Sequence, residues 1–190
     1  MLGLLALMIA LSQWASAGMI YAKAWLAPLL IERAYTTSQR EQTAIKPWPW
    51  ADHHPVARLT FPRGKLERWV LNNDSGNALA FGPGMASGVR PGERGLAMVS
   101  GHRDTHFRFL RELRQGDEIR IEFEGQGFSY RVTDTVVADA REGILNAPLP
   151  QQGLLLVTCY PFDAITPGGP LRFVAIAEEV NAAPVLVPRH

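Results

Sequence analysis

Alternating apolar and polar positions run through much of the chain after residue 55, and they predict β-strands. Residues 119–123 and 128–133 alternate most regularly, and Gly125-Gln126-Gly127 separates them as a turn. Residues 57–61 and 66–71 form an earlier pair of alternating segments. Because successive side chains of a strand point to opposite faces, each pair predicts a hairpin with one buried face.

Three further segments are mainly apolar and also predict strands: residues 96–99, 154–157 and 171–177. The middle one has no polar alternation, so we expect it to be buried on both faces. Residues 77–93 are rich in glycine and proline and predict irregular structure. A total of roughly seven or eight short strands favours an all-β domain, either a closed barrel or a sandwich.

One segment among these strands has helical spacing. Phe107, Leu110 and Leu113 recur at every third position. Asp104 precedes them as a candidate N-cap, and Gly116 follows them as a stop signal. The pattern therefore predicts a short helix with one apolar stripe.

The N-terminus is the strongest break in composition. Residues 2–31 are mostly apolar, and because about 20 apolar residues span a bilayer, residues 2–22 suffice for one transmembrane helix, with Trp25 at the interface. A cleaved signal peptide is the alternative, since Ala15-Ser16-Ala17 has the small residues of a cleavage site. No positive charge precedes the apolar run, and the run continues beyond this site. We therefore favour an uncleaved membrane anchor.

Residues 32–55 are interpreted as a linker. Residues 32–41 are able to extend a helix from the anchor. The helix is expected to end before Lys46-Pro47-Trp48-Pro49-Trp50, because proline excludes helix at itself and at the residue before it. The two tryptophans either pack on the domain or rest at the membrane surface. His53 and His54 are expected to be linker residues, since a metal site requires further ligands.

Length and charge narrow the class of protein. The 190 residues suffice for one domain with a sizeable core, and the net charge of +1 gives no reason to expect nucleic-acid binding. We divide the chain into an anchor or signal peptide over residues 1–31, a linker over residues 32–55, a domain over residues 56–180 and a tail over residues 181–190.

Cys159 is the only cysteine in the chain, so an internal disulfide is excluded. It is either a small core residue or a reactive thiol. It follows the apolar strand 154–157 and Thr158, and Pro161 stops further strand pairing. We therefore expect the sulfur at a strand–loop junction, a position that holds a nucleophile on a rigid support.

A cysteine nucleophile needs a base and a group that stabilises negative charge. His102 follows an apolar strand through Ser100-Gly101, so it is expected at a strand end, like Cys159. Arg172 lies near the start of the last strand. If that strand pairs antiparallel with the cysteine strand, the guanidinium lies near the sulfur and is able to hold an oxyanion. A turn histidine and a solvated strand arginine are the alternatives.

Three motifs resemble the signatures of an enzyme family. Ser100-Gly101-His102-Arg103-Asp104-Thr105, Leu156-Val157-Thr158-Cys159 and Leu171-Arg172-Phe173 are similar to the histidine, cysteine and arginine motifs of sortases, which are membrane-anchored cysteine transpeptidases. Pro47-Trp48-Pro49-Trp50-Ala51-Asp52 and Cys159-Tyr160-Pro161-Phe162-Asp163-Ala164 are most similar to the Gram-negative sortase class.

The resemblance covers about residues 45–180 and implies an eight-stranded β-barrel with one or two short helices, preceded by an N-terminal transmembrane helix. It implies Cys159 as the nucleophile, His102 as the acid and base, and Arg172 as the oxyanion stabiliser. No metal or cofactor is expected.

Neighbouring residues are expected to support the reaction or contact the substrate. Thr158 precedes the nucleophile, and Asp104 and Thr105 are close enough in sequence to orient the histidine, although Asp104 serves equally as a helix cap. His106 is a departure, because related sortases often carry an aromatic residue there. The loop 160–170 either shapes a substrate groove or is only a sharp connection.

By the same resemblance, the substrate is a secreted protein with a C-terminal sorting motif similar to Leu-Pro-x-Thr-Gly. The motif itself and the accepting amine are not encoded in the chain. The expected location is the cell (inner) membrane, single-pass, with the catalytic domain on the extracytoplasmic side. This orientation comes from the resemblance alone, because Lys23 and Arg33 by themselves favour a cytoplasmic C-terminal side.

Three other classes of protein stay open at this point. A metallohydrolase would use His102 and His106, which have a ligand spacing but no evident third ligand. A membrane-tethered binding module would carry Cys159 as a structural residue. A plain cysteine protease would differ only in using water as the acceptor.

Overall fold

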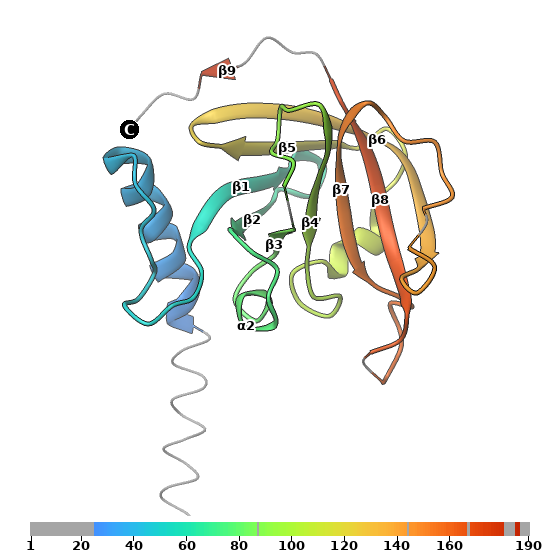
Figure 1. The fold of residues 1–190 in the computed structure, drawn as a ribbon, viewed down its shortest axis with the longest axis horizontal. Coiled ribbons are helices and arrows are strands. Elements are labelled where there is room, and N and C mark those ends of the chain that lie inside the picture. Colours follow the sequence, from blue (N-terminus) through green and yellow to red (C-terminus); the bar gives the residue numbers. More distant parts are fainter. Residues whose placement is uncertain (1–24, 87, 144, 167, 181–184, 187–190) are drawn as a thin grey trace, which may run out of the picture.

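The computed structural model describes residues 25–86, 88–143, 145–166, 168–180 and 185–186, and within these ranges eight strands close into a barrel (Figure 1). The strands are β1 (Pro55–Phe61), β2 (Leu66–Leu71), β3 (Gly84–Ala86), β4 (Gly95–Ser100), β5 (Glu118–Phe123), β6 (Gln126–Asp139), β7 (Gln152–Cys159) and β8 (Leu171–Glu179). Around the barrel they follow the order β5-β1-β2-β3-β4-β7-β8-β6, and β6 pairs with β5 to close it. The prediction of an eight-stranded barrel is confirmed, and the sandwich is excluded.

Alternation along the strands builds the core. In β1, every second residue is buried and the residues between them are half-buried. β1 pairs antiparallel with β2, and β5 with β6, so both predicted hairpins are present. The inward side chains form one cluster, whose larger members include Leu59, Phe61, Val70, Val99, Phe107, Leu110, Ile119, Ile121, Tyr130, Leu154 and Leu156.

The expectation that residues 154–157 are buried on both faces is wrong. Leu154 and Leu156 are buried, whereas Leu155 and Val157 are only half-buried. A closed barrel has a single interior, so alternate residues of β7 must point outward even where the sequence is continuously apolar.

The prediction of a helix that starts at Asp104 is also wrong, because the segment forms turns and then a short 3-10 helix. Residues 103–107 form turns, and the short 3-10 helix η2 (Arg108–Glu112) follows them. Asp104 caps no helix. Phe107 and Leu110 are nevertheless fully buried, so the apolar spacing correctly identified the inward side chains. The Phe107 ring packs directly on Gly101, where an added Cβ would lie 2.7 Å from the ring; this close packing folds the segment back against the barrel end.

Residues 77–93, predicted to be irregular, contain two short elements. These are the end of α2 (Gly76–Leu79) and the strand β3. The Ser75 side chain accepts a hydrogen bond from the Ala78 N–H and caps α2, which is the N-cap chemistry that serine favours.

A helix over residues 25–41, drawn in blue in Figure 1, packs against the outside of the barrel. Ile31 is buried on this face, and the Tyr35 ring lies 4.8 Å from the Trp69 ring between centroids. The Tyr35 hydroxyl donates to a Glu122 carboxylate oxygen at 3.3 Å. The helix is therefore docked on the barrel by its side chains, and it runs across the boundary placed between residues 31 and 32.

The two tryptophans of the predicted linker have different surroundings. Trp48 packs edge-on against the rings of His53 and Phe81, with centroid distances of 5.3 and 5.0 Å. His53 is buried, and its Nδ1 lies 2.8 Å from a carboxylate oxygen of Asp52. Trp50 is 80% exposed. The segment after the helix therefore packs on the barrel through Trp48, while Trp50 faces outward.

The predicted membrane anchor lies outside the described residues up to residue 24. None of the helices formed by the described residues has the length and apolar character needed to cross a bilayer. Of the predicted tail, residues 181–190, only the two-residue strand β9 (Val185–Leu186) is described, and it pairs with the start of β6.

Tyr35→Phe tests how the helix is held. Burial and the Glu122 carboxylate raise the pKa of Tyr35 above its ordinary value of about 10. Neutral Tyr35 is therefore favoured in the folded state, and this contribution to stability is complete below pH about 10 and is lost as the pH rises above it. We expect the wild type to lose unfolding free energy more steeply above that pH than Tyr35→Phe does. Urea denaturation over a pH series measures both slopes, and equal slopes would contradict the assignment.

Candidate active site

Parallel pairing of β4 with β7 brings the predicted histidine and cysteine to one edge of the barrel. Ser100 is the register partner of Val157, and the Gly101 N–H extends the ladder by donating to the Val157 carbonyl at 3.0 Å. His102 and Cys159 each lie two residues beyond this register pair. β4 and β7 run in the same direction and end on the same side of the barrel (Figure 1), so the two residues emerge there together.

Antiparallel pairing of β7 with β8 places Arg172 directly opposite Cys159. Directly opposite residues share a face of the sheet, with Cβ atoms about 4.5–5.5 Å apart. The expected strand pairing is thus confirmed. The Arg172 guanidinium donates to the carbonyls of Gly169 at 2.6 Å and Leu171 at 2.9 Å, so it also fastens the end of the loop 160–170.

Thr158 links the cysteine strand to the histidine loop. Its side chain is buried, and its hydroxyl donates to the Gly101 carbonyl at 2.7 Å. This bond joins the residue before Cys159 to the residue before His102. It therefore limits how far the two candidate catalytic residues move apart.

Arg103 belongs to the histidine motif but is not among the site residues predicted from the sequence. It is 7% exposed, although it is an arginine. Its guanidinium donates to both carboxylate oxygens of Asp104, at 2.8 and 2.9 Å. It also donates to the carbonyls of Pro161 at 2.6 Å and Ala164 at 2.8 Å. One buried side chain thus ties the histidine loop to the loop that follows the cysteine.

The electrostatic surroundings of Arg103 include the cysteine. The pKa of Arg103 is raised first by the hydrogen bond to Asp104, and Cys159 contributes to the same shift. A cation therefore lies within electrostatic range of the candidate nucleophile. Arg103 in turn lowers the pKa of Asp104, while His102 has the weakest influence among the charges acting on that carboxyl. Asp104 is thus primarily the partner of Arg103.

His102 and Thr105 are exposed at this edge, and His106 is half-buried beside them. Burial lowers the pKa of His106, and the neighbouring Arg68 lowers it further, so His106 is neutral at neutral pH. Among the described residues, no group of three or more histidine, cysteine, aspartate or glutamate side chains gathers to hold a metal ion. Geometry in the described part of the chain therefore offers no third ligand to His102 and His106.

The loop 160–170 is anchored at its start and exposed at its centre. The Phe162 ring packs edge-on against Phe173, with a centroid distance of 5.1 Å, and contacts the main core cluster. Ile165, three residues further on, is fully exposed. The loop is therefore held in place beside Cys159 while it presents an apolar side chain outward.

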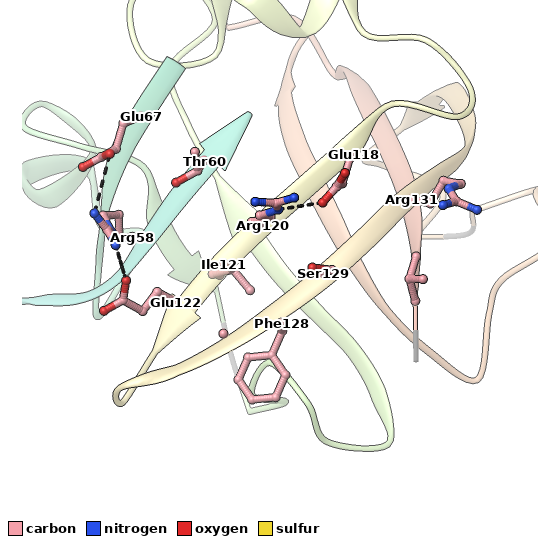
Figure 2. A pocket seen from close by; sticks show the side chains of 12 residues that line it. Arg58, Thr60, Glu67, Glu118, Arg120, Ile121, Glu122, Phe128, Ser129 and Arg131 are labelled. Atoms are coloured by element: carbon pink, nitrogen blue, oxygen red, sulfur yellow. Dashed lines mark hydrogen bonds and ion pairs between the residues drawn. The ribbon is translucent and has the colours of Figure 1, made fainter. Parts of the chain in front are cut away.

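A groove of about 630 Å³ lies on the outer faces of β1, β2, β5 and β6 (Figure 2). Arg58 pairs there with Glu122, and Arg120 pairs with Glu118. β5 lies three strands away from β7 around the barrel, and no residue of the predicted site lines the groove. We therefore assign the candidate site to the β4–β7–β8 edge.

This barrel, with a cysteine, a histidine and an arginine brought to one edge by β4, β7 and β8, defines a sortase-like protein. Residues 59–180 match the Sortase domain family. Sortase D of Bacillus subtilis (strain 168) is 30% identical to the chain over 125 residues, which cover 65% of this chain and 63% of that protein. The chain therefore belongs to the sortase family, whose members are cysteine transpeptidases, and it spans slightly less than two thirds of this curated relative.

Solved structures agree on the fold. Sortase A from Corynebacterium diphtheriae superimposes with a TM-score of 0.61 at 19% identity, covering 92% of this chain and 96% of that chain. The Clostridium perfringens Sortase D5 transpeptidase has a TM-score of 0.61 at 17% identity, with coverage of 82% and 99%. Listeria monocytogenes sortase A has a TM-score of 0.57 at 22% identity, with coverage of 69% and 90%.

Replacing Arg103 with glutamine tests its role as a clamp. Arg103→Gln removes the forked donors to Pro161 and Ala164, so hydrogen exchange of the Ala164 N–H, which donates to the Pro161 carbonyl, should accelerate at least about tenfold while the core strands stay protected. Arg103→Lys should not restore protection, because one ammonium does not reproduce the planar fork. Arg108→Gln, at an exposed arginine nearby, is the matched control. Unchanged exchange in the loop of Arg103→Gln would refute the clamp.

Proposed function

We propose that this protein is a membrane-anchored sortase that cleaves a C-terminal sorting motif of a secreted protein through a thioester at Cys159 and transfers the acyl group to an amine. The observation that carries the proposal is the pairing of Cys159 with Arg172 at the edge where His102 emerges. Nucleophile, acid–base group and charge stabiliser come from three neighbouring strands, which is the division of labour that covalent acyl transfer needs.

In the first half of the proposed reaction, the Cys159 thiolate attacks the carbonyl carbon of the scissile amide. The carbonyl oxygen gains the negative charge, and the Arg172 guanidinium stabilises it together with backbone N–H groups. Protonated His102 donates its proton to the leaving nitrogen as the C–N bond breaks. A thioester and a free amine are the products, and His102 is left neutral.

In the second half, an incoming amine attacks the thioester carbonyl. Neutral His102 accepts a proton from the attacking nitrogen, the C–S bond breaks, and a new amide forms. The thiolate and protonated His102 are thereby restored. Water in place of the amine gives hydrolysis from the same intermediate, so the protease alternative differs only in the acceptor.

The supporting residues have separable parts in this scheme. Thr158 holds the histidine loop against the cysteine strand, and Asp104 holds Arg103. Thr105 is exposed beside the histidine loop, where we propose that it contacts the substrate. No step in this scheme requires a metal ion or an organic cofactor.

Membrane attachment and subclass are part of the proposal. The apolar run over residues 2–22 supports a single-pass anchor in the cell (inner) membrane, and we propose that the catalytic domain lies on the extracytoplasmic side, as the resemblance to sortases implies. The segments 47–52 and 159–164 support the Gram-negative sortase class.

Intact-mass spectrometry on the full-length chain in detergent tests the proposed chemistry. Mixed with a small library of sorting-motif-like peptides, the wild type should form a thioester adduct, and hydroxylamine should convert it to a hydroxamate product. Cys159→Ala should form no adduct. His102→Ala and Arg172→Ala should lower kcat/KM by at least about 100-fold, the usual loss for an acid–base group or an oxyanion donor.

Arg120→Ala is the matched control for Arg172→Ala, because Arg120 is also a strand arginine but pairs with Glu118 on the far side of the barrel. A product that is the same with and without an added amine would replace the transpeptidase with a hydrolase. Activity that survives Cys159→Ala, or that a chelator abolishes, would reject the proposed mechanism.

A further inference from the structure

Large apolar side chains are exposed at few places on the described part of the chain. They are Trp25, Leu26, Leu29, Trp50, Val137, Leu149 and Ile165. Five of these seven belong to three segments: the start of the helix 25–41, the turn at residues 48–51, and the loop 160–170. Isolated exposed apolar residues are ordinary, whereas apolar residues gathered on one side of a protein indicate an interaction surface.

The outward face of the helix changes character along its axis. Trp25, Leu26 and Leu29 are 74%, 45% and 49% exposed, respectively. Glu32 and Arg33, the next exposed residues on the helix, are charged. At a rise of about 1.5 Å per residue, the change from apolar to charged takes place within about 5 Å. Such a boundary matches the narrow transition from hydrocarbon to water at a membrane surface.

Trp50 is held in a fixed turn. The Ala51 N–H donates to the Trp48 carbonyl at 3.0 Å, and Ala51 is buried. The Asp52 carboxylate accepts a hydrogen bond from the Asn77 side chain at 3.2 Å, which fastens the turn to α2. The exposed indole of Trp50 is thus presented by a packed segment.

Ile165 is likewise presented by a fixed segment. Arg103 holds the carbonyls of Pro161 and Ala164, and Phe162 packs against the core. Asp163 is the single charged residue between positions 160 and 170. The loop therefore offers a fully exposed aliphatic side chain with little charge around it.

The three segments lie along the same edge of the molecule. In Figure 1, the start of the blue helix, the turn before β1 and the loop between β7 and β8 all extend toward the lower side of the view. The ends of β4 and β7 point to the same side. Val137 lies in β6, and Leu149 lies in the connection before β7. These two exposed apolar residues are outside the three segments and serve as controls.

We propose that this edge docks on the surface of a lipid bilayer, with Trp25, Trp50 and Ile165 as separate contacts in the interfacial layer. The proposal rests on the membrane attachment proposed above. The apolar run over residues 2–22 ends just before Trp25, so the bilayer is the partner nearest to this edge. Tryptophan favours the membrane interface, and contacts from three separate segments restrict the orientation of the domain more than a single contact does.

Docking in this orientation has a consequence for the substrate. His102 and Cys159 emerge on the docked edge, so the sorting motif reaches them along the membrane surface.

Site-specific fluorescence quenching tests the docking without requiring catalysis. Full-length Cys159→Ala, which has no other cysteine, is placed in lipid nanodiscs with single substitutions Trp50→Cys, Ile165→Cys, Val137→Cys or Leu149→Cys. Each cysteine carries an environment-sensitive dye, and spin-labelled lipids act as quenchers. Because interfacial contacts reach about 5–10 Å into the bilayer surface, we expect at least about twofold quenching at positions 50 and 165 and little at positions 137 and 149.

Equal quenching at all four positions, or none at positions 50 and 165, would overturn the docking. A blue shift at these two positions that depends on protein concentration but not on quencher would instead indicate a second copy of the chain, and would also overturn it. Release of the protein from the nanodiscs by an alkaline wash would refute the membrane anchor itself, which separates failure of the proposed function from failure of the docking.

A kinetic comparison gives a second test. Trp50→Asp should lower turnover of a lipid-tethered sorting peptide by about tenfold, while turnover of the same peptide in solution is unchanged, because only the tethered peptide depends on orientation at the bilayer. Leu149→Asp should change neither rate. Equal loss on both peptides would mean that Trp50 acts on the fold or the active site and not through the membrane.

Discussion

Parallel pairing of β4 with β7 is the constraint on which the site depends. Parallel neighbours need a long crossover connection, and here the crossover contains η2 and the β5–β6 hairpin. β5 pairs with β1 and β6 pairs with β8, so the same connection that makes β4 and β7 parallel also closes the barrel. The juxtaposition of His102 and Cys159 thus depends on the direct pairing of β4 with β7, and loss of that pairing would separate them.

Arg103 adds a second constraint at the same edge. Burying a guanidinium is unfavourable unless its donors are satisfied, and Asp104, Pro161 and Ala164 accept from them here. The histidine loop and the loop 160–170 consequently share one buried cation. The position of each loop therefore depends on the other through the hydrogen bonds of Arg103.

Periodicity in the sequence was sufficient to predict most strands, whereas the candidate triad came from the resemblance of three motifs to sortase signatures and stays a prediction. β2 and the β5–β6 hairpin appear where alternation places them, because alternation records directly which side chains face the interior. The segment after Asp104 was predicted wrongly because packing of Phe107 on Gly101 overrides helical spacing. Contacts of Arg103 with carbonyls 58 and 61 residues away leave no local pattern, so only the folded chain reveals them.

The start of the helix 25–41 and the candidate site lie on the same side of the domain (Figure 1), and this coincidence follows from the topology. The helix 25–41 begins at the edge where β4 and β7 end, and Tyr35 and Ile31 hold it in that direction against the barrel. A chain that enters the domain at this edge therefore has its candidate nucleophile facing the same way as its N-terminal segment. In the proposed docking, a motif far from the bilayer has to pass around the domain to reach Cys159, so the distance of a motif from the membrane would contribute to substrate selection beside its sequence.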